Sequence, residues 1–192
     1  ASSWFLPHRR LHGAVRDYLL ALTAAHEGRP GALDAAAVSL ARDTAVVLGA
    51  VPLDLARGLR AEAAWRRGDP TTAARALGSL ELRSFYQQAV SSPFSSLARE
   101  RWLLAEALAS SGEPEAALRW FQSFEHHSIY DLAYAAPAAL RRGELLERLG
   151  RHAEAAVAFR RAIHLWRACD EEGLPLRRRA EIGLSRVTAN AR

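Results

Sequence analysis

The stretch LRRGELLERLGRHAEAAVAFRRA, residues 140–162, decides the fold that the sequence predicts. Good helix formers fill both sides of Gly150, which stands where a left-handed residue can end one helix before the next begins. The pattern therefore predicts two antiparallel helices joined by a tight turn. Small residues at Gly143 and Ala155 would let these helices approach closely, and Phe159 would fill the gap toward a neighbouring pair.

The same arrangement recurs around three earlier glycines. Gly112 has a small residue seven positions before it, another five after it and an aromatic residue nine after it, whereas Gly68 has leucine in the aromatic position and Gly28 matches more weakly. Successive turn glycines are 40, 44 and 38 residues apart, which indicates an internal repeat of helix pairs. The matching residues are Ala105, Ala117 and Phe121 around Gly112, Ala61, Ala73 and Leu77 around Gly68, and Ala21 and Leu33 around Gly28.

Prolines mark where these helices are expected to begin, because the first helical turn does not need the missing N–H group. They are Pro30, Pro52, Pro70, Pro93, Pro114, Pro137 and Pro175. With the turn glycines they predict helices over 8–27, 31–49, 52–67, 70–79 with an irregular continuation to 90, 94–110, 114–125, 136–149, 152–170 and 175–189. We therefore expect an all-α chain with one domain over 1–192.

The expected domain contains helix pairs over about 8–49, 52–90, 94–125 and 136–170. The helix at 175–189 is expected to cap them, because a stack of repeats must cover its last apolar surface. The residues predicted to form the buried side of this cap are Leu176, Ala180, Leu184 and Val187. Arg177, Arg178 and Arg179 would then lie in solvent.

The spacing of small residue, turn glycine, small residue and aromatic residue resembles the tetratricopeptide (TPR) repeat. The segments 140–146, 158–160, 165–166 and 170–175 resemble the carboxy-terminal repeats of bacterial multidomain signalling proteins, namely serine/threonine kinases and winged-helix or activation-domain regulators. The resemblance implies a right-handed α-solenoid of about four TPR-like pairs. It also implies a non-catalytic part of a larger protein, in the cytoplasm or, alternatively, on the periplasmic side of a membrane-anchored protein.

Charge and hydropathy argue against two classes of partner. All 26 basic residues are arginine, and the net charge of +5 is spread over both halves of the chain, so no basic arm is expected to follow a nucleic acid backbone. The longest strongly apolar uncharged run, 44–53, is about half of what a bilayer span needs. Cys169 is the only cysteine, which permits a reducing compartment. We expect neither nucleic acid binding nor membrane insertion.

No group of residues predicts catalysis, so we expect no enzyme, no catalytic residue and no cofactor. His126, His127 and Asp131 could suggest a metal, but adjacent residues on a helix face different ways and a third ligand would have to come from elsewhere. We therefore expect no metal site. The aromatic residues of the second helix of a pair are expected to be core or stacking residues; they are Trp120, Phe121 and Phe124.

The expected binding surface lies on the first helix of each pair, which lines the groove of such a solenoid. A glutamate precedes each of three turn glycines by six positions, and tryptophan and arginine residues, which are typical of binding hot spots, lie nearby. The candidate partner-binding residues are Glu62, Trp65, Arg66, Arg99, Trp102, Glu106, Arg141, Glu144 and Arg148. An equally weighted interpretation is that the glutamates only form ion pairs within their own helices, such as Glu144 with Arg141 and Arg148.

The leading hypothesis is a scaffold that binds a peptide or protein in the groove. One alternative is a sensory domain that binds a small ligand or peptide there. Another is a self-assembly module that forms a homo-oligomer through the apolar end at Trp4, Phe5 and Leu6. The sequence does not separate the first two hypotheses.

Overall fold

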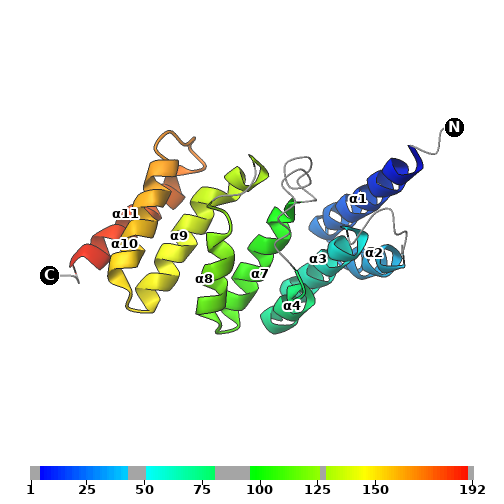
Figure 1. Cartoon of the computed structure of the whole chain (residues 1–192), viewed down its shortest axis with the longest axis horizontal. Helices are drawn as coiled ribbons and strands as arrows, with labels where there is room; N and C mark the ends of the chain where they lie inside the picture. Colours follow the sequence, from blue (N-terminus) through cyan, green and yellow to red (C-terminus); the bar gives the residue numbers. More distant parts are fainter. Residues whose placement is uncertain (1–4, 43–50, 81–95, 126–128, 190–192) are drawn as a thin grey trace. The chain divides into compact units, whose positions relative to one another are not determined.

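The computed structural model describes residues 5–42, 51–80, 96–125 and 129–189, with side chains from residue 12 onward (Figure 1). These residues form α-helices and one short 3-10 helix and contain no strand, which confirms the all-α class. The helices divide into two compact units, residues 1–84 and 85–192, and each unit is described by itself.

The first unit contains four helices: α1 (Phe5–His26), α2 (Gly31–Ala41), α3 (Val51–Arg66) and α4 (Pro70–Leu77). The helix α3 packs against the other three, and α1 also contacts α2. The core of the first unit consists mainly of alanines, with a few fully buried leucines, which are Leu33, Leu55, Leu59 and Leu77. The predicted helix at 31–49 is described only as far as Ala41, and the predicted continuation to 90 lies outside the described residues.

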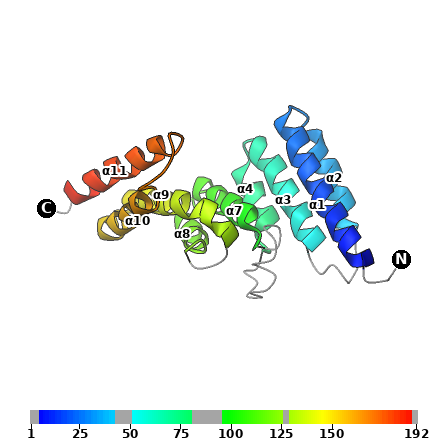
Figure 2. The ribbon, with the colours of Figure 1, turned by 90° about the horizontal axis from the view of Figure 1, so that it is seen from above.

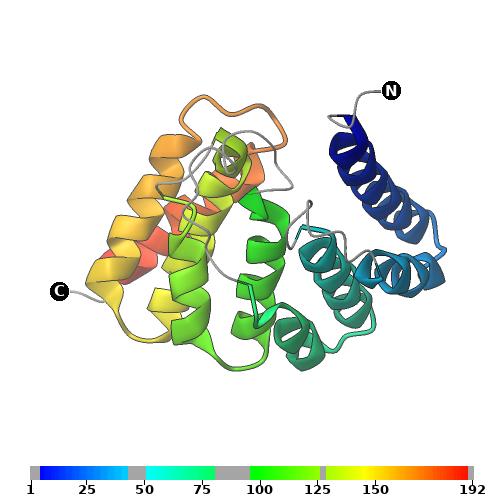
Figure 3. The same cartoon turned by 45° about the vertical axis from the view of Figure 1, so that its right-hand side comes forward.

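The second unit contains α7 (Ala98–Ser110), α8 (Pro114–Gln122), the 3-10 helix η2 (Ile129–Asp131), α9 (Leu132–Arg148), α10 (His152–Leu165) and α11 (Leu174–Ala189). The pairs α7–α8 and α9–α10 are helical hairpins (Figure 3). The helix α9 contacts α7 on one side and α11 on the other, so the first helices of the two hairpins and α11 are successive neighbours (Figure 2).

The turns between paired helices follow the predicted chemistry. Gly28, Gly68, Gly112 and Gly150 all have φ between 73° and 88°, the left-handed region that favours glycine. The residue after each glycine donates its backbone N–H to the carbonyl five residues earlier at 2.9–3.0 Å, which satisfies a carbonyl at the helix end. The four glycine turns therefore share one hydrogen-bonded geometry, as the repeat predicts.

Several helix starts also match. Pro70 and Pro114 occupy the first position of α4 and α8, and Asp69 caps α4 by accepting a hydrogen bond from the N–H of Thr72 at 2.9 Å. This hydrogen bonding lowers the pKa of Asp69 below its ordinary value. Pro93 lies outside the described residues.

Pro137 does not begin a helix, which corrects the prediction. The helix α9 begins five residues earlier, at Leu132, and Pro137 lies inside it. Proline removes the hydrogen bond that the carbonyl of Ala133 would accept in a regular helix. Because Ala133 is exposed, water can hydrogen bond to that carbonyl instead. The helix α10 is also shorter than predicted, ending at Leu165.

Phe159 of α10 packs between glycines of two other helices. Its side chain is fully buried, and a Cβ atom added to Gly143 of α9 or to Gly183 of α11 would lie only 2.6 Å or 2.5 Å from the ring. The predicted close approach at Gly143 is therefore confirmed. The ring also fills the space toward α11, which needs a glycine of its own at that point.

The packing of α11 corrects the predicted buried side of this helix. Ala180 and Val187 are buried as expected, but the third buried residue is Gly183, while Leu184 is only partly buried and Leu176 is 36% exposed. The physical reason is the size of Phe159, because α11 must turn its smallest side chain toward the ring. This orientation moves Leu176 away from the core.

Candidate functional site

A groove of about 340 Å³ lies across the neighbouring helices α7, α9 and α11 of the second unit, with the end of α10 closing one side. Three predicted residues line it: Trp102, Glu106 and Arg141. The other lining residues are Pro137, Leu140, Trp166, Leu176 and Arg179. The groove thus combines aromatic and aliphatic surface with acidic and basic groups.

Trp102 is held in place by a cluster of aromatic rings. Its ring centroid lies 5.2 Å from that of Phe121, 6.3 Å from that of Phe124 and 5.7 Å from that of Tyr134. Phe121 and Phe124 are buried, which confirms their assignment to the core, and burial raises the pKa of Tyr134. Because Trp102 itself stays partly exposed, it presents a rigidly supported edge to the groove.

A buried arginine, Arg101, packs against this aromatic cluster. Arg101 is 3% exposed, forms an ion pair with Asp131, donates a hydrogen bond to the hydroxyl of Ser123 at 2.9 Å, and lies 4.6 Å from the ring centroid of Phe124. Desolvation lowers the pKa of Arg101, while the nearby carboxylate of Asp131 acts in the opposite direction. Together these contacts join α7 to the end of α8 and the start of α9.

The ion pair between Arg101 and Asp131 involves one of the three residues that could suggest a metal site. The carboxylate of Asp131 is engaged by Arg101, and the two histidines of the suggestion, His126 and His127, lie outside the described residues. Within the described part of the chain, no three potential ligands among histidine, cysteine, aspartate and glutamate come together. The described residues therefore offer no support for a metal at this position.

Four charged side chains alternate in sign across the groove and form what we call the ion-pair ladder: Glu106, Arg141, Glu144 and Arg179. Arg141 donates two hydrogen bonds to the carboxylate of Glu106, at 2.7 and 2.8 Å, and a third to Glu144 at 2.7 Å. Arg179 donates two bonds to Glu144, one of them at 2.8 Å. Hydrogen bonding to Glu106 raises the pKa of Arg141. The ladder joins α7 to α9 and α9 to α11.

The ladder repeats with the helix pairs. Arg141 follows Glu106 by 35 residues, and Arg179 follows Glu144 by the same interval. In both cases a glutamate of α7 or α9 binds an arginine of the next helix along the groove, α9 or α11. The two carboxylates and two guanidinium groups neutralise one another, so the groove presents paired charges next to apolar surface.

The predicted glutamates form ion pairs both within their own helices and between helices. The pair Glu144–Arg141 within α9 is present, as one interpretation of the sequence expects. Arg148 is exposed and forms no ion pair with Glu144 among the described contacts. The contacts between helices are more extensive than that single pair, and sequence reasoning did not anticipate them.

The remaining predicted site residues lie elsewhere. Glu62, Trp65 and Arg66 belong to the first unit, where Arg66 binds Glu62 at 2.6 Å and the carbonyl of Ala25 at 3.1 Å. These bonds connect α3 to the end of α1. Arg99 is partly buried beside Glu100 and does not line the groove.

Trp166, Leu176 and Arg179 of the groove were not predicted, because they follow the last hairpin turn and its expected binding helix. One signal could have found Arg179: opposite charges recur at a constant interval of 35 residues. The self-assembly prediction at Trp4, Phe5 and Leu6 concerns side chains outside the described ones.

The fold and the groove define this chain as an all-α protein built from helical hairpins, with a candidate binding surface on the first helices of its second unit. The chain matches no family model, no curated protein and no solved structure. None of the helices in the described ranges is both long and apolar enough to span a bilayer.

Proposed function

We propose that this chain is a non-catalytic TPR-like repeat protein whose second unit binds a peptide or a protein segment in its groove. Four helix pairs, α1–α2, α3–α4, α7–α8 and α9–α10, share the same glycine turn, and the ion-pair ladder repeats at a constant interval. Both features support a repeat of the kind that forms an α-solenoid. The resemblance to the carboxy-terminal repeats of bacterial signalling proteins supports a regulatory role.

The single observation that carries the proposal is the partly exposed Trp102, which lines the groove and is packed against three other aromatic rings. An aromatic side chain already fixed by its neighbours loses little conformational freedom on binding, which is the property of a hot-spot anchor. Leu176 and Trp166 extend the apolar surface on the other side of the groove. These three residues would bind an apolar side chain of the partner.

The paired charges predict how the partner is selected. Because Glu106 and Arg141 already neutralise each other, a strongly charged peptide gains little from either of them. A peptide with an apolar anchor and neutral polar neighbours would fit better. Its binding should depend weakly on salt, in contrast to binding through unpaired arginines.

The test is selection of peptides from a random library displayed on phage, followed by affinity measurement of the selected peptides by isothermal titration. We expect Trp102→Ala to weaken the binding of groove peptides by at least about ten-fold, a loss of about 1.4 kcal/mol. Trp120→Ala is the matched control, because Trp120 is also partly buried but lies on α8 outside the groove. It should change the affinity by less than about two-fold.

Circular dichroism must show that both variants remain helical. Equal losses in Trp102→Ala and Trp120→Ala would contradict the groove assignment. So would a selection that returns only acidic or basic peptides whose binding disappears in high salt. In that case the alternative sites of the chain would have to be considered.

A further inference from the structure

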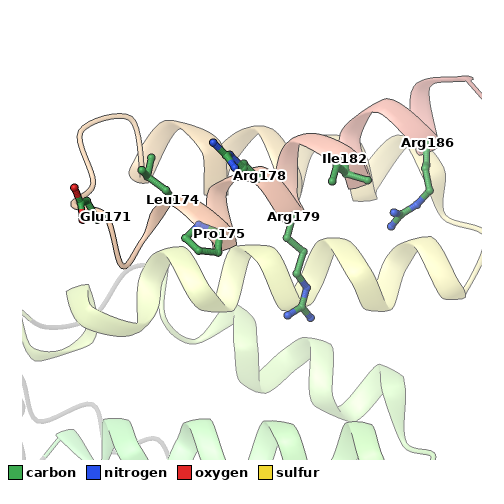
Figure 4. A pocket seen from close by; sticks show the side chains of 7 residues that line it. All are labelled: Glu171, Leu174, Pro175, Arg178, Arg179, Ile182 and Arg186. Atoms are coloured by element: carbon green, nitrogen blue, oxygen red, sulfur yellow. The ribbon is translucent and has the colours of Figure 1, made fainter.

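The surface of α11 that faces away from the core forms a second depression, of about 700 Å³, which we call the α11 outer face (Figure 4). It is lined by Glu171, Leu174, Pro175, Arg178, Arg179, Ile182 and Arg186. Leu174 is 39% exposed and Ile182 is 57% exposed on the helix that was expected to cap the stack. An apolar strip bordered by arginines therefore remains open.

Residues of the α11 outer face correspond, at a constant sequence interval, to residues of α9 at the groove. The interval of 38 residues that separates Gly112 from Gly150 also relates Pro137 to Pro175, Arg141 to Arg179, and Glu144 to Ile182. On α9, Glu144 binds the arginine of the next helix. On α11, the corresponding position holds the exposed Ile182, so the ladder ends and an apolar side chain takes the place of the glutamate.

The position of the face indicates what shape of partner fits. On α9 the equivalent surface is where the following helix, α11, makes its contact. The equivalent surface of α11 is therefore the place at which one more helix would continue the stack. A helix is accordingly the element expected to cover Leu174 and Ile182.

The charges of the face indicate the chemistry of that helix. Arg179 and Arg186 bind Glu144 and Glu147 of α9. Arg178 is exposed, has no ion pair among the described residues, and extends to the side opposite Arg179 in Figure 4. A carboxylate on the incoming helix would supply the missing partner.

A second copy of this chain fits this chemistry poorly. Its first helix, α1, would be the natural element to continue the stack head to tail. That helix contains Arg9, Arg10 and Arg16 but only one acidic residue, Asp17, so it would bring like charge toward the arginines of α11. An acidic partner avoids this repulsion.

We infer that the α11 outer face docks an acidic amphipathic helix of a partner protein. The apolar side of that helix would cover Leu174 and Ile182, and its carboxylates would bind Arg178 and the outer side of Arg186. This surface shares Arg179 with the groove around Trp102, but Leu174, Arg178 and Ile182 line the α11 outer face and not the groove.

The probe for this inference is a fluorescently labelled synthetic peptide that forms an amphipathic helix, with leucines along one side and glutamates next to them. Its binding to the full chain is followed by fluorescence anisotropy. We expect saturable binding that Ile182→Ser and Arg178→Glu each weaken by at least about ten-fold. A peptide with lysine in place of each glutamate should bind at least about ten-fold more weakly than the acidic one.

Matched controls distinguish peptide binding at the α11 outer face from a general charge effect and from binding in the groove. Arg160→Glu makes the same charge change at an exposed position of α10 and should alter the affinity by less than about two-fold. Trp102→Ala should leave the acidic peptide bound, because that residue lies in the groove. Ile182 is exposed, so Ile182→Ser should keep the helical circular dichroism spectrum.

Five outcomes would overturn the inference, and the last of them would leave the proposed function standing. These are the absence of saturable binding to the wild type, equal binding of the lysine peptide, and equal losses in Arg178→Glu and Arg160→Glu. The fourth is sedimentation showing a dimer that Ile182→Ser dissociates, which would make a second copy the occupant. Loss of peptide binding in Trp102→Ala but not in Ile182→Ser would assign the peptide to the groove and leave only the proposed function standing.

Discussion

The two units place a glutamate at the same position of the hairpin, six residues before the turn glycine, and use it differently. In the first unit, Glu62 binds Arg66 one turn later on the same helix. In the second unit, Glu106 and Glu144 bind arginines of the next first helix, 35 residues later. The same residue thus stabilises a helix locally in one unit and joins successive helices in the other.

The cores of the two units also differ in the size of the residue nine positions after the turn glycine. The position nine residues after the turn glycine holds Leu77 in the first unit and Phe121 or Phe159 in the second, and all three are fully buried. A phenylalanine needs space that the neighbouring helices must provide. Phe121 packs against the ring of Trp102, whereas Phe159 occupies the space left by Gly143 and Gly183. The second unit therefore depends more on matched large and small residues.

The largest expected effect tests this dependence on glycine. Gly183→Ala should lower the free energy of unfolding by about 1–3 kcal/mol, because the ring of Phe159 cannot move away from α11 without approaching Gly143. Gly13→Ala in α1 is the matched control, since nothing lies within 4 Å of an added Cβ there. That change should stabilise by about 0.5–1 kcal/mol through helix propensity alone. Urea denaturation followed by circular dichroism measures both, and changes of the same sign would contradict the difference between the units.

A smaller effect should distinguish the two uses of glutamate. A double-mutant cycle with Glu106→Gln and Arg141→Gln should give a coupling free energy of about 1–2 kcal/mol, because two hydrogen bonds join partly buried groups on different helices. The corresponding cycle for Glu62 and Arg66 should give less, since residual helix in the unfolded chain can retain a pair one turn apart. A coupling in the first unit equal to or above that in the second would remove the distinction.

The smallest expected effect is on the pH dependence of stability at low pH. Arg186 hydrogen bonds to Glu147 and lowers its pKa below the ordinary value of 4.5. Because the pKa is lower in the folded state, this stabilisation is present above pH 4.5 and is lost as the pH falls through the folded-state pKa. The difference in unfolding free energy between the wild type and Glu147→Gln should therefore shrink as the pH is lowered below 4.5.

A control for the pH prediction comes from the first unit. Hydrogen bonding to Thr72 lowers the pKa of Asp69 below 3.8, but asparagine caps a helix about as well as aspartate. Asp69→Asn should therefore change stability little at any pH, and its small pH dependence should appear below 3.8. Urea midpoints measured across this range test both variants. A constant difference between the wild type and Glu147→Gln would show that the carboxylate charge of Glu147 does not matter.

The candidate site could be predicted only in part. Trp102, Glu106 and Arg141 were found because they lie on α7 and α9, the first helices of two pairs, which the repeat was expected to place at the groove. Leu176 was expected to be buried, and its exposure depends on how α11 turns to accommodate Phe159. Trp166 directly follows α10, the second helix of its pair, where no binding residue was expected. The pair of Arg101 with Asp131 joins residues 30 positions apart with no local pattern to connect them.

The sequence by itself determined the helical class, the glycine turns and the second-helix core residues, because helix propensity and the left-handed backbone of glycine act within a few residues. The tertiary structure decided which charges meet, which side of α11 is buried and which residues line the groove. Those outcomes depend on the rotation and separation of whole helices, and these are set by side chains such as Phe159 that contact residues far along the chain.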